Sequence, residues 1–135
     1  MNGIRDNIFV LDSSFCINFL NTRIDTLPGG ELYISQITRI ELVSKPEFMG
    51  NSSARQEASD FISRTTVIPL NDKVEYQTVR IRRNNPGIKL PDAIIAATAL
   101  AMNARFLSCD KDLVSQICRI MPESRAEYVK PLDAP

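Results

Sequence analysis

Three aspartates stand where an apolar segment of the chain meets a polar one, and their carboxylates could do chemistry. Asp12 follows the apolar run IFVL, Asp110 follows RFLSC, and Asp92 opens the alanine-rich segment AIIAATALA. Glu41 lies shortly after another largely apolar run, ELYIS. Carboxylates that converge in a partly dry pocket repel one another unless a cation lies between them. Because such ligands are hard oxygen donors, the expected cation is Mg²⁺ or Mn²⁺.

Each aspartate also has an ordinary explanation as a helix cap. An aspartate at the start of a helix accepts hydrogen bonds from unpaired backbone N–H groups and suits the helix dipole. Taken singly, Asp12, Asp92 and Asp110 fit that explanation better than a metal-binding one. In open α/β sheets, however, ligands bind beyond the carboxyl ends of the strands. Asp12 and Asp110, each following an apolar strand pattern, are expected at that edge together.

Glu41 has an ordinary explanation too, because Lys45 lies four residues further on and an exposed Glu–Lys pair is common on helices. Against this, Glu41 shares a predicted helix face with Ile37 and Ile40, which we expect to be buried. A carboxylate on a buried face requires a partner. Glu41 is therefore grouped with the three aspartates as a candidate site residue.

The composition narrows the possible chemistry. The chain has no histidine, which removes Ser-His-Asp and Cys-His nucleophile pairs and imidazole-bound zinc. Its three cysteines show no CxxC spacing, so neither a disulfide framework nor a thiolate zinc site is expected. With 16 basic and 16 acidic residues the formal net charge is zero, so a polyanion must be met by a local patch. No apolar stretch has the length of a bilayer span, and we expect a cytoplasmic location with no membrane partner.

Strand and helix patterns alternate along the 135 residues. Strands are predicted at residues 8–11, 31–35, 65–70, 105–109 and 127–132, the last as an edge strand. Helices are predicted at residues 15–20, 37–44, 53–64, 72–83, 93–104 and 113–120, with KPEFMGNSS as a break. Pro91 is expected in the first turn of the alanine-rich helix that contains residues 93–104. On the helix at 72–83 the expected apolar side is Val74, Val79 and Ile81. The alternation predicts one α/β domain over residues 1–135, with a central, mostly parallel sheet of four to five strands and helices on both faces.

Four motifs, in this order and spacing, resemble one known family. They are VLDSS, ISQITRIEL, LPDAIIAATAL and FLSCD, and the resemblance covers residues 8–113. The chain is similar to the PIN domain and, at this length, to the VapC-type toxins of bacterial toxin–antitoxin pairs. In that family four acids form an acidic pocket on a single PIN domain. Carried over by position, they are Asp12, Glu41, Asp92 and Asp110.

The resemblance implies a metal-dependent endoribonuclease that acts as the toxin of a type II toxin–antitoxin pair. Its substrate would be single-stranded or looped RNA, whose phosphodiester bonds it would hydrolyse. Asp12, Asp92 and Asp110 would position Mg²⁺ or Mn²⁺, and Glu41 would orient the attacking water or a second ion. A divalent cation can activate water and neutralise charge on phosphate, so this chemistry requires no histidine. The resemblance also implies a cognate antitoxin and a homodimer.

Hydroxyl groups recur beside the acids, as the family pattern predicts, at Ser13, Ser35 and Ser108. Capping or turn hydrogen bonds explain these serines about as well as contact with substrate does. The identity of the fourth acid is open, because Asp112 lies only two residues after Asp110 and either aspartate could be the fourth acid of the pocket. Leu113 stands where the family commonly has an aromatic residue. The fourth ligand is therefore the one that the sequence defines least.

Anionic RNA is repelled by an acidic pocket unless positively charged side chains near the pocket bind its phosphates. The segment VRIRRNNPGIK, just before Asp92, carries such side chains. The candidate RNA-binding residues in this segment are Arg80, Arg82, Arg83 and Lys89. A run of solvated surface charges is the alternative for any one of them. Reversing the charge of Arg82 and Arg83 should weaken RNA binding and flatten its dependence on salt if they contact the RNA backbone.

Two other classes with an aspartate after the first strand fit less well. A haloacid-dehalogenase-type phosphatase needs a second aspartate two residues later, where this chain has Ser14. A phosphoacceptor receiver domain would carry an early acidic pair and a lone aspartate in mid-chain, which this sequence lacks. The stronger rival is a catalytically silent PIN-like module that binds RNA or protein. The four acids argue against it, because a silent module has no physical reason to keep carboxylates that repel one another.

Overall fold

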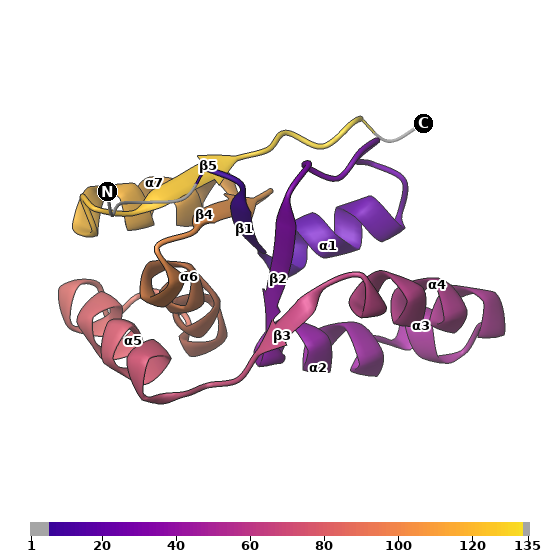
Figure 1. Cartoon of the computed structure of the whole chain (residues 1–135), viewed down its shortest axis with the longest axis horizontal. Helices are drawn as coiled ribbons and strands as arrows, with labels where there is room; N and C mark the ends of the chain where they lie inside the picture. The colour runs from indigo at the N-terminus through magenta and orange to yellow at the C-terminus, as the bar shows by residue number, and fades with distance from the viewer. Residues whose placement is uncertain (1–5, 134–135) are drawn as a thin grey trace.

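The computed structural model describes residues 6–133, which form five strands and seven helices (Figure 1). The strands are β1 (Ile8–Leu11), β2 (Glu31–Ser35), β3 (Thr66–Ile68), β4 (Arg105–Ser108) and β5 (Arg125–Tyr128). The helices are α1 (Ser13–Leu20), α2 (Gln36–Ser44), α3 (Pro46–Met49), α4 (Ser52–Ser63), α5 (Asp72–Asn84), α6 (Leu90–Met102) and α7 (Lys111–Ile120). Within this range no helix combines the length and the apolar character that crossing a bilayer requires.

All five strands run parallel in one sheet, in the order β3-β2-β1-β4-β5. β1 lies at the centre, and all four of its residues are buried. The run IFVL is apolar throughout because helices cover both faces of the sheet. The predicted α/β class, with a parallel sheet of four to five strands, is therefore confirmed. Residues 1–5 and 134–135 of the predicted domain lie outside the described residues.

The two faces of the sheet carry separate apolar cores. Ile8 and Val10 point to one face, where they join Phe106 and the apolar sides of α5, α6 and α7. Phe9 and Leu11 point to the other face, toward α1 and α4. Figure 1 shows these two groups of helices on opposite sides of the sheet. Successive side chains of β1 thus anchor both helical layers, as the alternation along a strand dictates.

Helix α2 turns a different face to the core from the one that the sequence suggested. Ile40 and Val43 are 51% and 57% exposed, whereas Thr38 and Leu42 are buried. The prediction that Ile37 and Ile40 share a buried face was therefore wrong for Ile40. Because α2 carries apolar side chains around much of its circumference, their spacing does not single out the face that packs on the protein.

Four smaller differences concern the other elements. On α5, Val79 is 40% exposed, and Thr78 lies in the core instead, its hydroxyl bonded to a carbonyl of its own helix. The alanine-rich helix begins at Leu90, with Pro91 in its first turn as predicted, and it ends at Met102 and not at residue 104. The last strand, β5, lies earlier than the predicted residues 127–132. The stretch KPEFMGNSS contains the one-turn helix α3.

Candidate functional site

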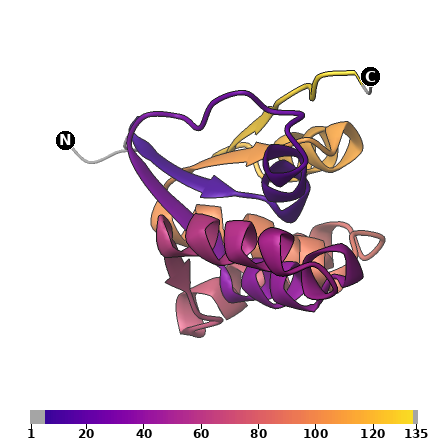
Figure 2. The ribbon, with the colours of Figure 1, turned by 90° about the vertical axis from the view of Figure 1, so that its right-hand side faces the viewer.

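Two of the predicted acids, Asp12 and Asp110, lie just after the ends of neighbouring strands of the sheet. β1 and β4 run side by side in the same direction, with Leu11 paired to Leu107 (Figure 2). Asp12 follows Leu11, and Ser108 follows Leu107, so Asp12 and Ser108 are adjacent. The Asp12 N–H donates a hydrogen bond to the Leu107 carbonyl at 2.9 Å. Asp110 comes two residues later, at the start of α7. The two aspartates thus lie at the carboxyl edge of the sheet, where α/β proteins bind ligands.

Helices bring the other two acids to the same edge. Asp92 lies in the first turn of α6, and Glu41 lies on α2, which follows β2 directly. Burial raises the pKa of Asp92, and the negative charges of Asp12, Asp110 and Glu41 raise it further. Lys89 is the cation that opposes this shift. The fold therefore gathers all four acids within electrostatic range of Asp92.

Asp12 is the most deeply buried of the four, with 3% of its surface exposed. It occupies the N-cap position of α1 but makes no side-chain cap hydrogen bond. Its Oδ2 instead accepts hydrogen bonds from the hydroxyls of Ser14 and Ser108, each at 2.7 Å. Burial raises the pKa of Asp12, and these two hydroxyls lower it in part. Helix capping therefore does not account for this carboxylate.

Asp110 is exposed and does cap a helix, since its Oδ1 accepts a hydrogen bond from the Leu113 N–H at 3.1 Å. Asp112 is exposed as well. Both aspartates line a hollow of about 230 Å³, here called the acidic hollow, together with Asp92, Lys89 and Gln116. Between the two, Asp110 is the residue whose charge raises the pKa of both Asp12 and Asp92. This coupling favours Asp110 as the fourth acid.

Glu41 contacts α1 and does not form the surface pair that its spacing suggested. The Ser13 hydroxyl donates a hydrogen bond to Glu41 Oε1 and lies 2.9 Å from the Thr38 hydroxyl. Lys45 pairs instead with Glu47, at 3.5 Å between Nζ and Oε1. Glu41 therefore belongs to the polar cluster at the sheet edge, and the ordinary explanation of an exposed Glu–Lys pair does not hold.

The hydroxyl groups near the acids have different roles. Ser35 caps α2 by accepting a hydrogen bond from a backbone N–H at 3.0 Å, so its ordinary explanation is sufficient. Ser13 and Ser108 contact acids directly. Two further hydroxyls of the cluster, Ser14 and Thr38, were missed by the sequence analysis. Ser14 was visible in the motif DSS, whereas only the packing of α2 on α1 reveals Thr38.

The four basic candidates for RNA binding lie in different environments. Lys89 lines the acidic hollow beside the aspartates. Arg80 forms an ion pair with Glu123 at 2.8 Å. Arg82 donates to two backbone carbonyls of the loop that leads to Lys89, at 3.3 and 2.5 Å. Arg83 is exposed. Arg80 and Arg82 thus have structural partners, which leaves Lys89 and Arg83 free to meet an external anion.

The carboxylate oxygens of the four acids suit a hard divalent cation in chemistry, but their side chains do not converge on one point. Within residues 6–133 no three acidic or cysteine side chains are close enough together to hold a metal ion. The carboxylate of Asp12 is nevertheless buried with neutral hydroxyls as its hydrogen-bond partners. A buried charge of this kind is stabilised by a cation, and oxygen ligands suit Mg²⁺ or Mn²⁺.

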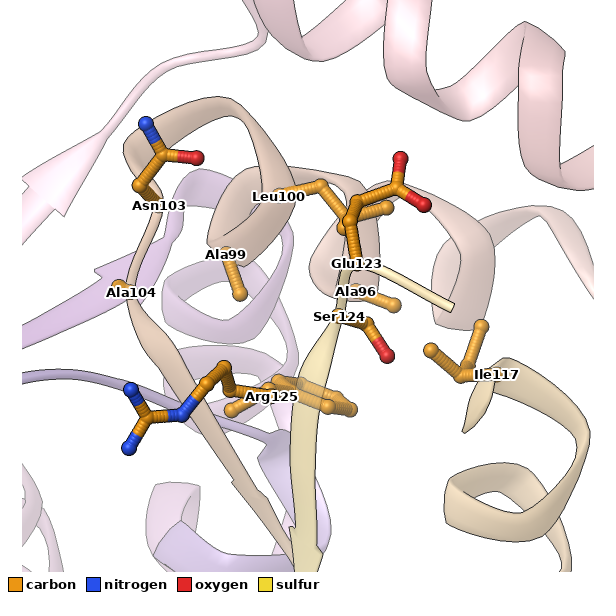
Figure 3. Close-up of a pocket in the computed structure, with 10 residues that line it drawn as sticks. Ala96, Ala99, Leu100, Asn103, Ala104, Ile117, Glu123, Ser124 and Arg125 are labelled. Carbon is orange, nitrogen blue, oxygen red and sulfur yellow. The ribbon is translucent and has the colours of Figure 1, made fainter. Parts of the chain in front are cut away.

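A second hollow lies near the start of β4 and β5, away from the acids (Figure 3). Its lining is mostly apolar, from Ala99, Leu100 and Phe106, with Glu123 and Arg125 at its margin. It contains none of the predicted acids. Since it opens at the amino ends of the strands, it lies on the edge opposite to the one where ligands bind in this class of fold.

The fold and the acid cluster together define a single-domain α/β protein with a carboxylate site at the carboxyl edge of a parallel sheet. The model of the PIN domain family matches residues 9–134 of the chain. The chain therefore belongs to the PIN domain family, as the four sequence motifs indicated. Among curated proteins no sequence matches this chain.

Several solved structures share this fold at low sequence identity. VapBC2 from Rickettsia felis, bound to a DNA fragment from its promoter, has a TM-score of 0.73 and 23% identity, covering 90% of this chain and 98% of that chain. VapBC-1 from nontypeable Haemophilus influenzae has a TM-score of 0.70 and 19% identity, with coverage of 90% and 97%. VapBC-5 from Mycobacterium tuberculosis, a toxin–antitoxin system, has a TM-score of 0.66 and 18% identity, with coverage of 92% and 98%. At these identities the likeness establishes the fold.

Proposed function

We propose that this PIN domain protein is a Mg²⁺- or Mn²⁺-dependent endoribonuclease that hydrolyses phosphodiester bonds of single-stranded or looped RNA. The observation that carries the proposal is the buried carboxylate of Asp12, which does not cap its helix and lies among three further acids. A cluster of acids at the ligand-binding edge of a sheet, in which burial raises the pKa of Asp12 and Asp92, is a candidate functional site on physical grounds.

In this proposal Asp12, Asp92 and Asp110 hold the cation, and Glu41 orients the attacking water. The cation, when bound, lowers the pKa of water and neutralises charge on the phosphate oxygens. The fold fixes the positions of the acids. Hydroxyl groups hold Asp12 and Glu41 in place, and the pairing of β1 with β4 sets the separation of the first and last aspartates. Such fixed placement removes the entropy cost of assembling the reacting groups.

The RNA backbone is proposed to approach over the acidic hollow. Lys89 lies there beside Asp92, so it can neutralise a phosphate next to the acids. Arg83 adds an exposed charge on the same segment. Arg82 acts indirectly by holding the loop that carries Lys89, and Arg80 is the weakest candidate because of its ion pair with Glu123. A neutral protein thereby offers a small positive patch to a polyanion.

The likeness to VapBC structures leads us to propose a toxin role, with a cognate antitoxin and a homodimer as protein partners. A groove of about 310 Å³ between α2 and α4 gives the antitoxin a docking place outside the acidic hollow. Its lining is apolar, with arginines at its margin: Leu42, Val43, Phe48, Ala58, Ile62, Arg39 and Arg55. A groove of this kind suits the apolar face of an amphipathic helix that carries acidic residues on its sides.

The nuclease is tested by incubating the purified protein with a structured RNA and Mn²⁺ or Mg²⁺, with and without EDTA. Asp12→Asn and Asp92→Asn should abolish cleavage, because each removes a proposed metal ligand. Asp25→Asn is the matched control, since Asp25 is an exposed aspartate outside the acid cluster, and it should cleave like the wild type. Cleavage that survives EDTA or either cluster substitution would contradict the mechanism.

A silent RNA-binding module is the second candidate, and one observation favours it. Within residues 6–133 no three acids already lie at the separation that a metal site requires. The two candidates differ in the cleavage assay. A silent module should bind RNA in EDTA as well as in Mn²⁺ and should release no fragments under either condition. The nuclease should release fragments with Mn²⁺ and none with EDTA.

A further inference from the structure

Two consecutive serines at the start of α1 contact two different acids. The Ser13 hydroxyl donates to Glu41, whereas the Ser14 hydroxyl donates to Asp12 Oδ2 at 2.7 Å. Neighbouring residues on a helix point about 100° apart, so the two side chains face different elements. Ser13 therefore meets the acid carried by α2, and Ser14 meets the acid that follows β1.

Ser14 and Ser108 contact the same carboxylate oxygen, and counting their protons fixes the direction of each hydrogen bond. The Cys109 N–H donates to Ser14 Oγ, and the Asp110 N–H donates to Ser108 Oγ, each at 2.9 Å. A hydroxyl has one proton to donate. Both protons are therefore directed to Asp12 Oδ2. The two serine oxygens lie 3.2 Å apart, a contact that carries no hydrogen bond when both donate to the carboxylate.

This arrangement makes Ser14 a link between three segments of the site. Its hydroxyl ties α1, which carries it, to the carboxylate after β1 and to the backbone after β4. The residue whose N–H it accepts, Cys109, immediately precedes Asp110, so the same hydroxyl constrains the separation of Asp12 and Asp110. Both serine hydroxyls bond Oδ2 of Asp12, and the backbone of Ser13 also bonds the carboxylate. A carboxylate has about four acceptor positions, so at least one position on Oδ1 remains for another ligand.

We propose that Ser14 is a positioning residue of the metal site: its hydroxyl holds Asp12 by Oδ2 so that Oδ1 stays available to a divalent cation. The inference rests on the proposed function, because it takes Asp12 as a metal ligand. In this proposal Ser14 contacts neither the cation nor the RNA and acts by positioning Asp12. Loss of a group that orients a metal ligand in this way typically costs about 10- to 100-fold in metal affinity.

The test measures Mn²⁺ affinity by isothermal titration calorimetry, with no RNA present. Ser14→Ala should weaken Mn²⁺ binding about 10- to 100-fold, the range known for loss of such a partner. Ser14→Thr keeps the hydroxyl and should bind close to the wild type. Ser14→Val has the shape of threonine without the hydroxyl and should bind as weakly as alanine. Ser63→Ala is the control, because it removes an exposed hydroxyl that bonds only the Asp60 carbonyl, at 2.7 Å.

Wild-type affinity in Ser14→Ala, or equal affinity in the Thr and Val variants, would overturn the positioning role. The Thr and Val pair decides the question if the alanine variant does not fold, since the two side chains differ by the hydroxyl and not in shape. If Mn²⁺ affinity depends on the Ser14 hydroxyl and the wild-type protein yet cuts no RNA, the nuclease is refuted and the positioning role of Ser14 stands. A wild-type protein that binds no Mn²⁺ would overturn both.

Discussion

Replacing Ser108 by alanine should strongly destabilise the metal-free protein near neutral pH. Ser108 is 0% exposed, so water cannot take the place of its hydroxyl. The hydroxyl donates to the Asp12 carboxylate at 2.7 Å and accepts a hydrogen bond from the Asp110 N–H at 2.9 Å. A hydrogen bond to a charged group contributes roughly 1.5–3 kcal/mol and a neutral one roughly 0.5–1.5 kcal/mol, so the expected loss is about 2–4.5 kcal/mol.

The loss should also depend on pH, because the hydroxyl stabilises the charged form of Asp12. Burial raises the pKa of Asp12 above its ordinary value of 3.8, and the Ser108 hydroxyl lowers it in part. The contribution of Ser108 is therefore present in full above the folded-state pKa of Asp12 and declines as the pH falls through that pKa. The difference in the free energy of unfolding between wild type and Ser108→Ala should narrow in acid.

Urea unfolding followed by circular dichroism, in EDTA at about pH 7 and about pH 4, measures both effects. Ser44→Ala is the control, because its exposed hydroxyl donates only to the Ile40 carbonyl of its own helix, at 2.6 Å. Its expected effect is within about 0.5 kcal/mol of the wild type. The reasoning is refuted if Ser108→Ala is as stable as this control at neutral pH. It is also refuted if the difference in the free energy of unfolding between wild type and Ser108→Ala is larger in acid than at neutral pH.

Two further predictions concern the charges of the acidic hollow. Asp92→Asn should raise the melting temperature of the metal-free protein near neutral pH. The pKa of Asp92 is raised in the folded protein, so the wild type loses folding stability as the pH rises through that pKa. Asparagine does not ionise, so the variant should not lose this stability. A lowered melting temperature would contradict this. Lys89→Ala should weaken RNA binding and reduce the slope of log affinity against log salt by about one. An unchanged slope would remove Lys89 from the RNA contact.

The parallel sheet and the position of Asp12 and Asp110 follow from the sequence because one pattern fixes both. A run as short and uniformly apolar as IFVL is typical of a strand covered on both faces, as in a parallel sheet, and the alternation of strands with helices favours the parallel arrangement. The residue after each strand then lies at the carboxyl edge by geometry alone. Asp12, directly after β1, and Asp110, two residues after β4, therefore lie at the same edge of the sheet whatever the detailed packing of the helices.

The orientation of α2 and the hydroxyl contacts do not follow from the sequence. Ile40 and Leu42 are equally apolar, and only the packing of α2 decides that Leu42 is buried while Ile40 is 51% exposed. Thr38 could be taken for a surface residue, yet it is 0% exposed and lies 2.9 Å from the Ser13 hydroxyl. Hydrogen bonds between residues far apart in sequence depend on side-chain positions that periodicity cannot supply.

The cost of keeping a charge at Asp12 separates the two candidate functions. Its carboxylate is 3% exposed, and burial is the main cause of its raised pKa, so ionising it costs folding stability that the two serine hydroxyls offset only in part. Asparagine at this position would keep a hydrogen-bond acceptor and avoid that cost. A silent module would therefore lose nothing in Asp12→Asn, which should be more stable than wild type and bind RNA equally well. For a nuclease the same variant should also be more stable, but it should lose the RNA cleavage that the wild type shows. A silent module cleaves no RNA with either side chain, so cleavage by the wild type and its loss in the variant tell the two candidates apart.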